Sequence, residues 1–113
     1  GVNHTLSGIS YKTFTATKPD VERATFTALN QMGIKVNGNE VTEEGIHRIT
    51  ATANERKVVV ELEALPIRTI RMRVTVIEDN GFFRDSATAT EIIIQSASAL
   101  DSQMAANAAT PRR

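Results

Sequence analysis

The sequence predicts an α+β fold in which an antiparallel sheet of about five strands carries two helices on one face, as a two-layer sandwich. Three features predict this class. Residues 57–78 alternate apolar and polar side chains with a period of two, and two other stretches repeat apolar residues every three or four positions. Short polar turns join the strands, whereas parallel neighbours need long crossovers. The expected element order is therefore β-α-β-β-β-β-α.

Residues 57–78 form the expected centre of the sheet, a hairpin with its turn around Pro66. One face of this hairpin is apolar and must be covered; it comprises Val58, Val60, Leu62, Ile70, Met72, Val74 and Val76. The other face carries Glu61 and Glu63 on one strand and Arg71 and Arg73 on the next, as a water-facing surface does. A three- or five-residue loop keeps each face together, and the five-residue loop places Glu63 opposite Arg71 and Glu61 opposite Arg73.

The clearest local signal runs from Thr17 to Asp20, where a hydroxyl stands three residues before a carboxylate and Pro19 falls between them. This is a capping-box pattern, and a proline in the first turn costs no hydrogen bond, so a helix is expected to begin here. Gly33 is expected to end it in a left-handed conformation. Phe26 is expected at the edge of the core. The buried stripe comprises Val21, Ala24, Thr25, Ala28, Leu29 and Met32.

A second helix is expected from Arg84, after a loop that contains Phe82 and Phe83. Its apolar stripe comprises Thr90, Ile93, Ile94, Ala97, Leu100 and Met104. Ile92 lies far from that stripe, so it is either an ordinary exposed residue or a contact for a protein partner. Phe82 is a second candidate for a protein contact. Alternatively, Phe82 and Phe83 form a hydrophobic plug beneath the helix.

The flanking segments set the domain boundaries. Residues 9–16 alternate without showing which face points inward, and residues 34–41 contain a turn or bulge at their Asn-Gly-Asn sequence. Residues 46–53 alternate again. We expect one domain over residues 9–104, a flexible lead-in over residues 1–8 and a disordered tail over residues 105–113.

The composition argues against several classes of function. Lys plus Arg and Asp plus Glu are both 13, so no net field attracts nucleic acid or an anionic membrane. The chain has no cysteine and only 4% aromatic residues, which removes thiolate metal sites and most platforms for stacking bases or sugars. No serine lies in a nucleophile elbow, and two histidines offer few general bases. We therefore expect no enzymatic activity and no cofactor.

Two polar groups suggest binding sites. One candidate is a metal site at His47 with Glu43 or Glu44, but a strand histidine that makes an ordinary hydrogen bond is the favoured interpretation. The second group is an anion-binding stripe on the open face of the sheet, formed by Arg68, Arg71 and Arg73, with Arg48 as a candidate neighbour. The glutamates interleaved with this stripe would neutralise most of its attraction, so surface ion pairs are the favoured interpretation there.

The chain resembles a family of small, uncharacterised bacterial envelope lipoproteins, a domain of unknown function. The resemblance covers residues 9–100 and rests on the order of these segments: Ser10-Tyr11-Lys12-Thr13-Phe14, the first helix ending at Met32-Gly33-Ile34-Lys35-Val36, Ile49-Thr50-Ala51, Val58-Val59-Val60-Glu61-Leu62, Thr69-Ile70-Arg71-Met72-Arg73-Val74 and the last helix. It implies export to the bacterial cell envelope, facing the periplasm, and lipidation on a cysteine upstream of Gly1. It supplies no catalytic residues.

Two hypotheses about function follow. The first is a non-enzymatic binding or structural module of the bacterial cell envelope, which meets another envelope protein or a second copy of itself. Its contact surfaces would be the edge strands and the exposed apolar residues Phe82 and Ile92. The second is a small-ligand or anion-binding protein that uses the arginine stripe. In neither case do we expect a nucleic-acid partner, and the membrane would be reached only through the upstream lipid anchor.

Overall fold

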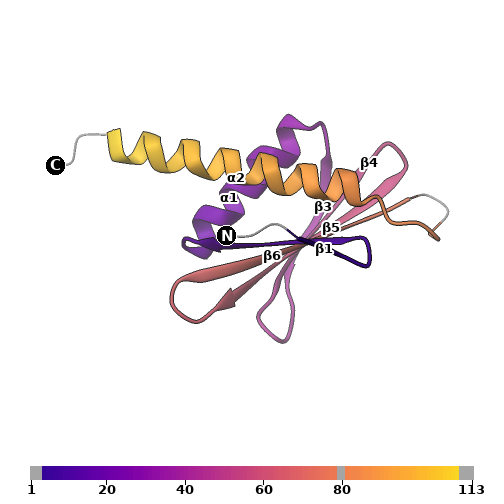
Figure 1. Ribbon diagram of the computed structural model, residues 1–113, viewed down its shortest axis with the longest axis horizontal. Coiled ribbons are helices and arrows are strands. Elements are labelled where there is room, and N and C mark those ends of the chain that lie inside the picture. The colour runs from indigo at the N-terminus through magenta and orange to yellow at the C-terminus, as the bar shows by residue number, and fades with distance from the viewer. Residues whose placement is uncertain (1–3, 79–80, 110–113) are drawn as a thin grey trace.

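The computed structural model describes residues 4–78 and 81–109. The elements follow the order β1 (His4–Leu6), β2 (Ile9–Thr15), α1 (Lys18–Gln31), β3 (Lys35–Val41), β4 (His47–Ala53), β5 (Arg56–Leu65), β6 (Thr69–Ile77) and α2 (Ser86–Ala109) (Figure 1). The predicted α+β class is confirmed, and so is the order β-α-β-β-β-β-α, which the short strand β1 precedes.

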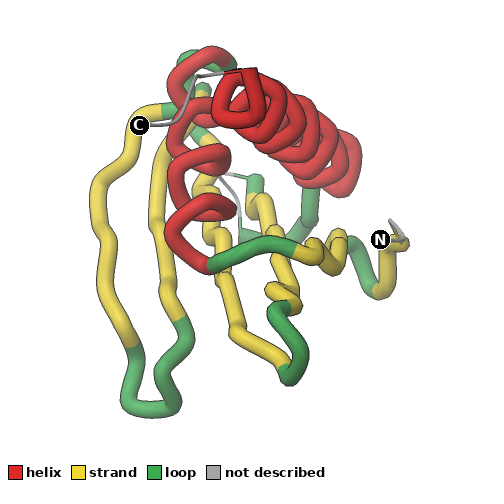
Figure 2. Tube along the Cα trace, turned by 90° about the vertical axis from the view of Figure 1, so that its left-hand side faces the viewer, coloured by secondary structure: helices red, strands yellow, loops and turns green. Residues whose placement is uncertain are grey.

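The six strands form one open sheet in the order β1-β2-β6-β5-β4-β3, with antiparallel pairing between neighbours. Both helices lie on one face of this sheet (Figure 2). Helix α1 contacts β3 and β5, α2 packs on β2 and β6, and the two helices pack against each other. The core lies between these layers, and the opposite face of the sheet is open to solvent.

The central hairpin has the predicted faces and register. Glu61 pairs with Arg73 and Glu63 with Arg71, and the apolar residues predicted to face the helices are all buried. Leu65 also pairs with Thr69, so the connection is residues 66–68, three residues rather than five. The predicted five-residue loop and this three-residue loop give the same register. The loop is shorter because one more pair of residues, Leu65 with Thr69, belongs to the strands.

Helix α1 begins and ends where the sequence predicts. The Thr17 hydroxyl accepts a hydrogen bond from the Asp20 amide at 3.4 Å, and Pro19 lies in the first turn. At the other end Gly33 has a φ of 72°, and the Ile34 amide donates to the Leu29 carbonyl at 2.9 Å. The predicted stripe packs into the core, and Phe26 is partly buried against it.

Helix α2 is rotated relative to its predicted stripe. Its buried residues are Ala89, Ile92, Ile93, Ser96 and Leu100. The interpretation of Ile92 as a surface residue is therefore wrong: its side chain is 0% exposed, whereas Ile94, assigned to the core, is 46% exposed. Because three isoleucines are consecutive, the hydrophobic pattern does not fix which side of the helix is buried. The buried side is centred on Ser96, whose side chain is small.

Both ends of the domain are more ordered than expected. His4–Leu6 form strand β1, so part of the expected lead-in pairs with β2 through the turn at Ser7 and Gly8. Both turn residues have positive φ, which suits the twist of a two-residue hairpin. Helix α2 continues through Ala109, because its alanine-rich end favours helix, and only residues 110–113 of the expected tail lie outside the described residues.

Strands β2 and β3 answer two questions that the sequence left open. Phe14 is buried on the helix side of β2, so the inward face of this strand carries Phe14 rather than Tyr11. Strand β3 is continuous, with the predicted irregularity as a bulge between Val36 and Gly38. A Cβ on Gly38 would lie 2.5 Å from Thr50 Oγ1, so at the bulge the Thr50 side chain on β4 occupies the space that a side chain at position 38 would need.

Candidate functional site

The open face of the sheet carries an ordered row of charges, which we call the ionic row: Glu40, Arg48, Glu61 and Arg73. These residues are in register on β3, β4, β5 and β6. Arg48 Nε and Nη2 each donate to Glu61 Oε2 at 3.1 Å, and Arg73 Nη1 donates to Glu61 Oε1 at 3.0 Å. Arg48 Nη1 also lies 3.9 Å from the Glu40 carboxylate. Arginines on both neighbouring strands thus neutralise Glu61.

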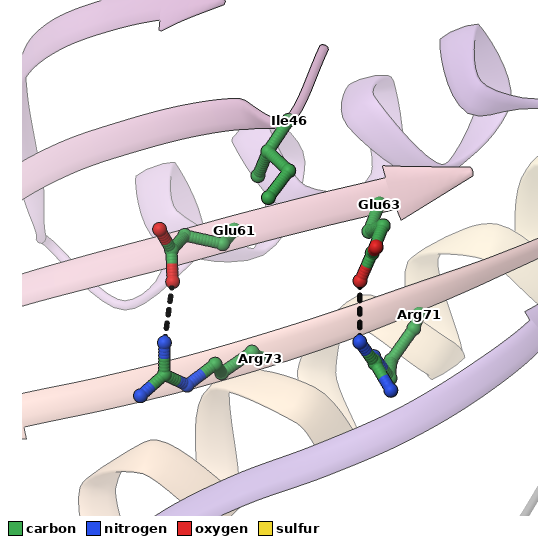
Figure 3. Close-up of a pocket in the computed structure, with 5 residues that line it drawn as sticks. All are labelled: Ile46, Glu61, Glu63, Arg71 and Arg73. Atoms are coloured by element: carbon green, nitrogen blue, oxygen red, sulfur yellow. Dashed lines mark hydrogen bonds and ion pairs between the residues drawn. The ribbon is translucent and has the colours of Figure 1, made fainter. Parts of the chain in front are cut away.

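A second ion pair, between Arg71 and Glu63, lies beside this row. Figure 3 shows the two pairs side by side with Ile46 next to them, around a hollow of about 160 Å³. Within the hollow each arginine points at a glutamate on the adjacent strand. The site therefore has almost no net charge to offer an anion, although both arginine side chains remain about half exposed.

The predicted arginine stripe is assembled only in part. Arg71 and Arg73 lie on the same face, but Arg68 lies in the turn at residues 66–68 and has no ion-pair partner among the described residues. Arg48 replaces it in the cluster, because β4 pairs with β5 in a register that sets Arg48 opposite Glu61. That register depends on the two-residue turn at Asn54 and Glu55, both with positive φ, which the sequence signals only weakly.

Phe82 and Phe83 form what we call the aromatic loop, between β6 and α2. Their exposed fractions are 86% and 62%, so they do not plug the space beneath α2. They border a hollow of about 560 Å³ whose other lining residues are Ser7, Gly8, Ile77, Gly81 and Arg84.

The backbone of the aromatic loop is held from two sides. The Glu78 amide donates to the Phe83 carbonyl at 2.9 Å, and Arg84 Nη1 donates to the Ser7 carbonyl at 2.7 Å. The loop is thus fixed to β6 and to the β1–β2 turn, while both phenylalanine residues are largely exposed to solvent. Ile92, the other predicted contact, is excluded from any such surface by its burial.

His47 makes ordinary polar contacts, as the favoured interpretation expected. Its Nδ1 lies 3.0 Å from the Glu22 carboxylate on α1, and its Nε2 contacts Asn39 Oδ1 on β3. Glu43 and Glu44 do not take part, and within residues 4–78 and 81–109 no three His, Cys, Asp or Glu residues gather closely enough to hold a metal ion. His47 instead ties the β3–β4 hairpin to α1.

Asp85 forms the most strongly linked polar cluster. Its carboxylate accepts a hydrogen bond from the Thr88 hydroxyl at 2.6 Å and one from the Thr88 amide at 3.0 Å, and it lies 2.8 Å from Arg56 Nε. The two Thr88 hydrogen bonds hold the pKa of Asp85 below its usual value, Arg56 adds to this, and burial opposes it. Asp85 therefore caps α2 and ties it to β5, which is a structural role.

The comparisons with known proteins give no family for this chain: no family model matches it, and no curated protein does. The resemblance to envelope lipoproteins thus stays a prediction. Neither helix, within the described residues, combines the length and the apolar character that a membrane span requires.

Proposed function

We propose that this protein is a non-enzymatic binding or structural module of the bacterial cell envelope, and that it contacts a protein partner through the aromatic loop. The observation that carries the proposal is the exposure of two adjacent phenyl rings, 86% for Phe82 and 62% for Phe83, beside a hollow. The chain has only four phenylalanines, and half of them are exposed here. Aromatic side chains are enriched among the residues that dominate protein interfaces.

The loop is suited to binding because its backbone is already fixed. Two hydrogen bonds, from the Glu78 amide to Phe83 and from Arg84 to Ser7, hold the loop in the free protein. Binding would therefore cost little conformational entropy in the loop backbone, and burial of both rings would favour the complex. Burying a phenylalanine side chain contributes about 1.5–3 kcal/mol, so the two rings would supply part of the free energy that offsets the cost of association.

The test is a binding measurement with purified protein and bacterial envelope preparations. Changing Phe82 and Phe83 together to serine should weaken co-sedimentation at least about tenfold, the size expected for losing one anchor residue. The matched control is Val41→Ser, which also removes an exposed apolar side chain, but at the end of β3. Vesicles of the extracted lipids alone separate protein binding from lipid binding. Equal binding by the double variant and the wild type would contradict the proposal.

The envelope location rests on the resemblance and has its own test. If the full-length product is an exported lipoprotein, fatty acid labelling should mark it, and it should fractionate with membranes. Replacing the cysteine that the resemblance places upstream of Gly1 should abolish both results. Recovery of an unlabelled product in the soluble fraction would contradict the envelope location. It would not contradict the proposed protein contact through the aromatic loop.

A second candidate function is anion binding on the open face of the sheet. It is favoured by the hollow between Arg71 and Arg73, and weakened by the glutamate that pairs with each arginine. Phosphate or sulfate should then raise the Tm of the wild type but not of a variant with Arg68, Arg71 and Arg73 changed to alanine. The same small shift in both proteins would exclude a specific anion site.

A further inference from the structure

The turn between β5 and β6 has a strained backbone. Ile67 and Arg68 have φ values of 63° and 51°, in the left-handed region that favours glycine. For a β-branched residue such as Ile67 this conformation is unfavourable, because its Cβ crowds the following carbonyl oxygen. Among the residues that the structure describes, Ile67 is the only β-branched one with a positive φ.

Two other turns show which residues this backbone geometry favours. The β1–β2 turn places Ser7 and Gly8 at positive φ, and the β4–β5 turn places Asn54 and Glu55 there. Each of these turns contains a glycine or an asparagine, which adopt the left-handed conformation most readily. The β5–β6 turn contains neither, so local turn chemistry does not account for Ile67.

Burial does not account for Ile67 either. Its side chain is 90% exposed, the highest value among the large apolar side chains in the described part of the chain. The Ile67 carbonyl accepts a hydrogen bond from Thr69 Oγ1 at 3.0 Å, but this bond needs only the backbone of residue 67. The side chain therefore adds strain without adding to the core, and strain of this kind is often found where a protein contacts a ligand.

The turn projects away from the rest of the molecule. Figures 1 and 2 show that the β5–β6 and β3–β4 turns extend beyond the two helices on the same side, and the pairing of His47 with Leu62 places them at one end of the sheet. The aromatic loop follows the other end of β6 (Thr69–Ile77). The β5–β6 turn is thus separate from the aromatic loop.

We propose that residues 66–68, which we call the hairpin tip, form a second contact for a protein partner. Ile67 enters an apolar pocket of the partner, and Arg68 meets a carboxylate at the rim of that pocket. The tip is convex, so the partner supplies the concave surface. Arg68 is exposed and has no ion-pair partner among the described residues, which leaves its charge available. This contact rests on the proposed binding function but not on the aromatic loop.

The charges at this end of the sheet favour a protein partner over a membrane. The β3–β4 turn carries Glu43 and Glu44, both exposed, and an anionic lipid surface would repel them. A single isoleucine also offers little apolar area for insertion into a bilayer. A protein pocket can receive Ile67 alone and pair with Arg68 beside it.

The first test measures the strain. Asparagine tolerates a positive φ, so Ile67→Asn should raise the Tm by about 3 °C or more. The matched control Glu55→Gly relaxes the β4–β5 turn in the same way and should also raise the Tm. Thermal unfolding followed by circular dichroism measures both variants. An unchanged or lower Tm for Ile67→Asn would show that Ile67 is not strained, and would overturn the proposal.

The second test measures co-sedimentation with a bacterial envelope preparation. Ile67→Asn should weaken binding at least about tenfold despite its higher Tm, and Arg68→Glu should weaken it as well, whereas Glu55→Gly should bind like the wild type. Digestion of the envelope proteins with a protease before mixing should abolish the difference between the wild type and Ile67→Asn. Equal binding by these two proteins would overturn the proposal, as would a difference that persists with vesicles of the extracted lipids.

The same measurement separates this contact from the aromatic-loop contact. If the double serine variant of Phe82 and Phe83 loses binding but Ile67→Asn does not, the hairpin tip is not a contact and the aromatic loop is. If Ile67→Asn alone loses binding, the hairpin tip is supported and the contact through the aromatic loop is contradicted. No protease-sensitive binding by the wild type would overturn both.

Discussion

Asp85 shows how one carboxylate can hold several parts of the molecule together. It caps α2 through Thr88, pairs with Arg56 at the start of β5, and its own amide donates to the Val76 carbonyl of β6 at 2.8 Å. Because its pKa is lowered in the folded protein, the charged form is the one that folding favours. Its contribution to stability is therefore complete above the unfolded-state pKa of about 3.9 and is lost as the pH falls through the folded-state value.

The first prediction concerns the pH dependence of this contribution. Asp85→Asn keeps a capping side chain but removes the charge, so the variant should be less stable than the wild type by about 1 kcal/mol at neutral pH. The difference should be constant between about pH 5 and pH 7 and shrink below about pH 4. Urea unfolding across this range measures it, with the exposed carboxylate change Glu44→Gln as control. A difference that grows on acidification would contradict the role given to Asp85.

Gly38 gives a second prediction at the residue scale. In Gly38→Ala the new methyl group would lie 2.5 Å from Thr50 Oγ1 but 3.9 Å from Thr50 Cβ. The change should destabilise the wild type by about 1–3 kcal/mol, as overpacking does, and cost much less in a Thr50→Ala background. Unfolding free energies of the four proteins form the required cycle. If Gly38→Ala costs the same in both backgrounds, contact with the Thr50 hydroxyl is not the reason for glycine.

At the scale of elements, Glu61 of the ionic row joins β4, β5 and β6, and the contact of Arg48 with Glu40 extends the row to β3. The side chain of Glu61 is 16% exposed, against 38% for Glu63, so water screens its two arginine contacts less. The coupling energy between Glu61 and Arg73 should therefore exceed that between Glu63 and Arg71, with each at or below about 1 kcal/mol. Double-mutant cycles with glutamine replacements measure both. Coupling that is equal, or larger for Glu63, would show that burial does not control these pairs.

The elements differ in how well the sequence predicts them. Helix α1 and the β5–β6 hairpin have strong local signals, a capping box at Thr17 and a strict alternation, and both are found where expected. Helix α2 lacks a single apolar stripe, because Ile92, Ile93 and Ile94 are consecutive and the packing centre is Ser96. Its rotation is set by contacts with α1 and β6, which local periodicity does not contain.

The residues of the candidate sites also differ in how well the sequence predicts their contacts. The cross-strand pairs of Glu61 and Glu63 follow from alternation within one hairpin, so they are predictable. The participation of Arg48, and the contact of His47 with Glu22 of α1, depend on how separate elements meet. The exposure of Phe82 and Phe83 is equally a matter of tertiary structure, since a plug beneath α2 has the same sequence pattern.

At the scale of the whole molecule, the strands differ in how many neighbouring elements hold them in place. Strands β5 and β6 have neighbours on both sides, whereas β3 lies at an edge and makes few contacts with α1. The β3–β4 hairpin is tied to α1 by the His47 contact with Glu22 and by Lys18 Nζ, which donates to the Gly45 carbonyl at 3.0 Å. Opening of β3 should therefore require less free energy than opening of the central strands.

Amide hydrogen exchange measures this order directly. Amides of β3 should exchange faster than those of β5 and β6, and Glu22→Gln should accelerate β3 without changing the central strands, because it weakens one tie to α1. A uniform acceleration across all strands would mean that the variant lowers global stability and that the hairpin does not open separately.

The end of α2 projects beyond the sheet, at the opposite end of the long axis from the aromatic loop (Figure 1). A single thiol introduced at Ala108 would be unique in this chain, which has no cysteine, and would lie on that projection. Coupling it to a biosensor surface would display Phe82 and Phe83 toward the flowing sample. Attachment through residue 108 would therefore allow candidate ligands to be screened while both rings stay accessible.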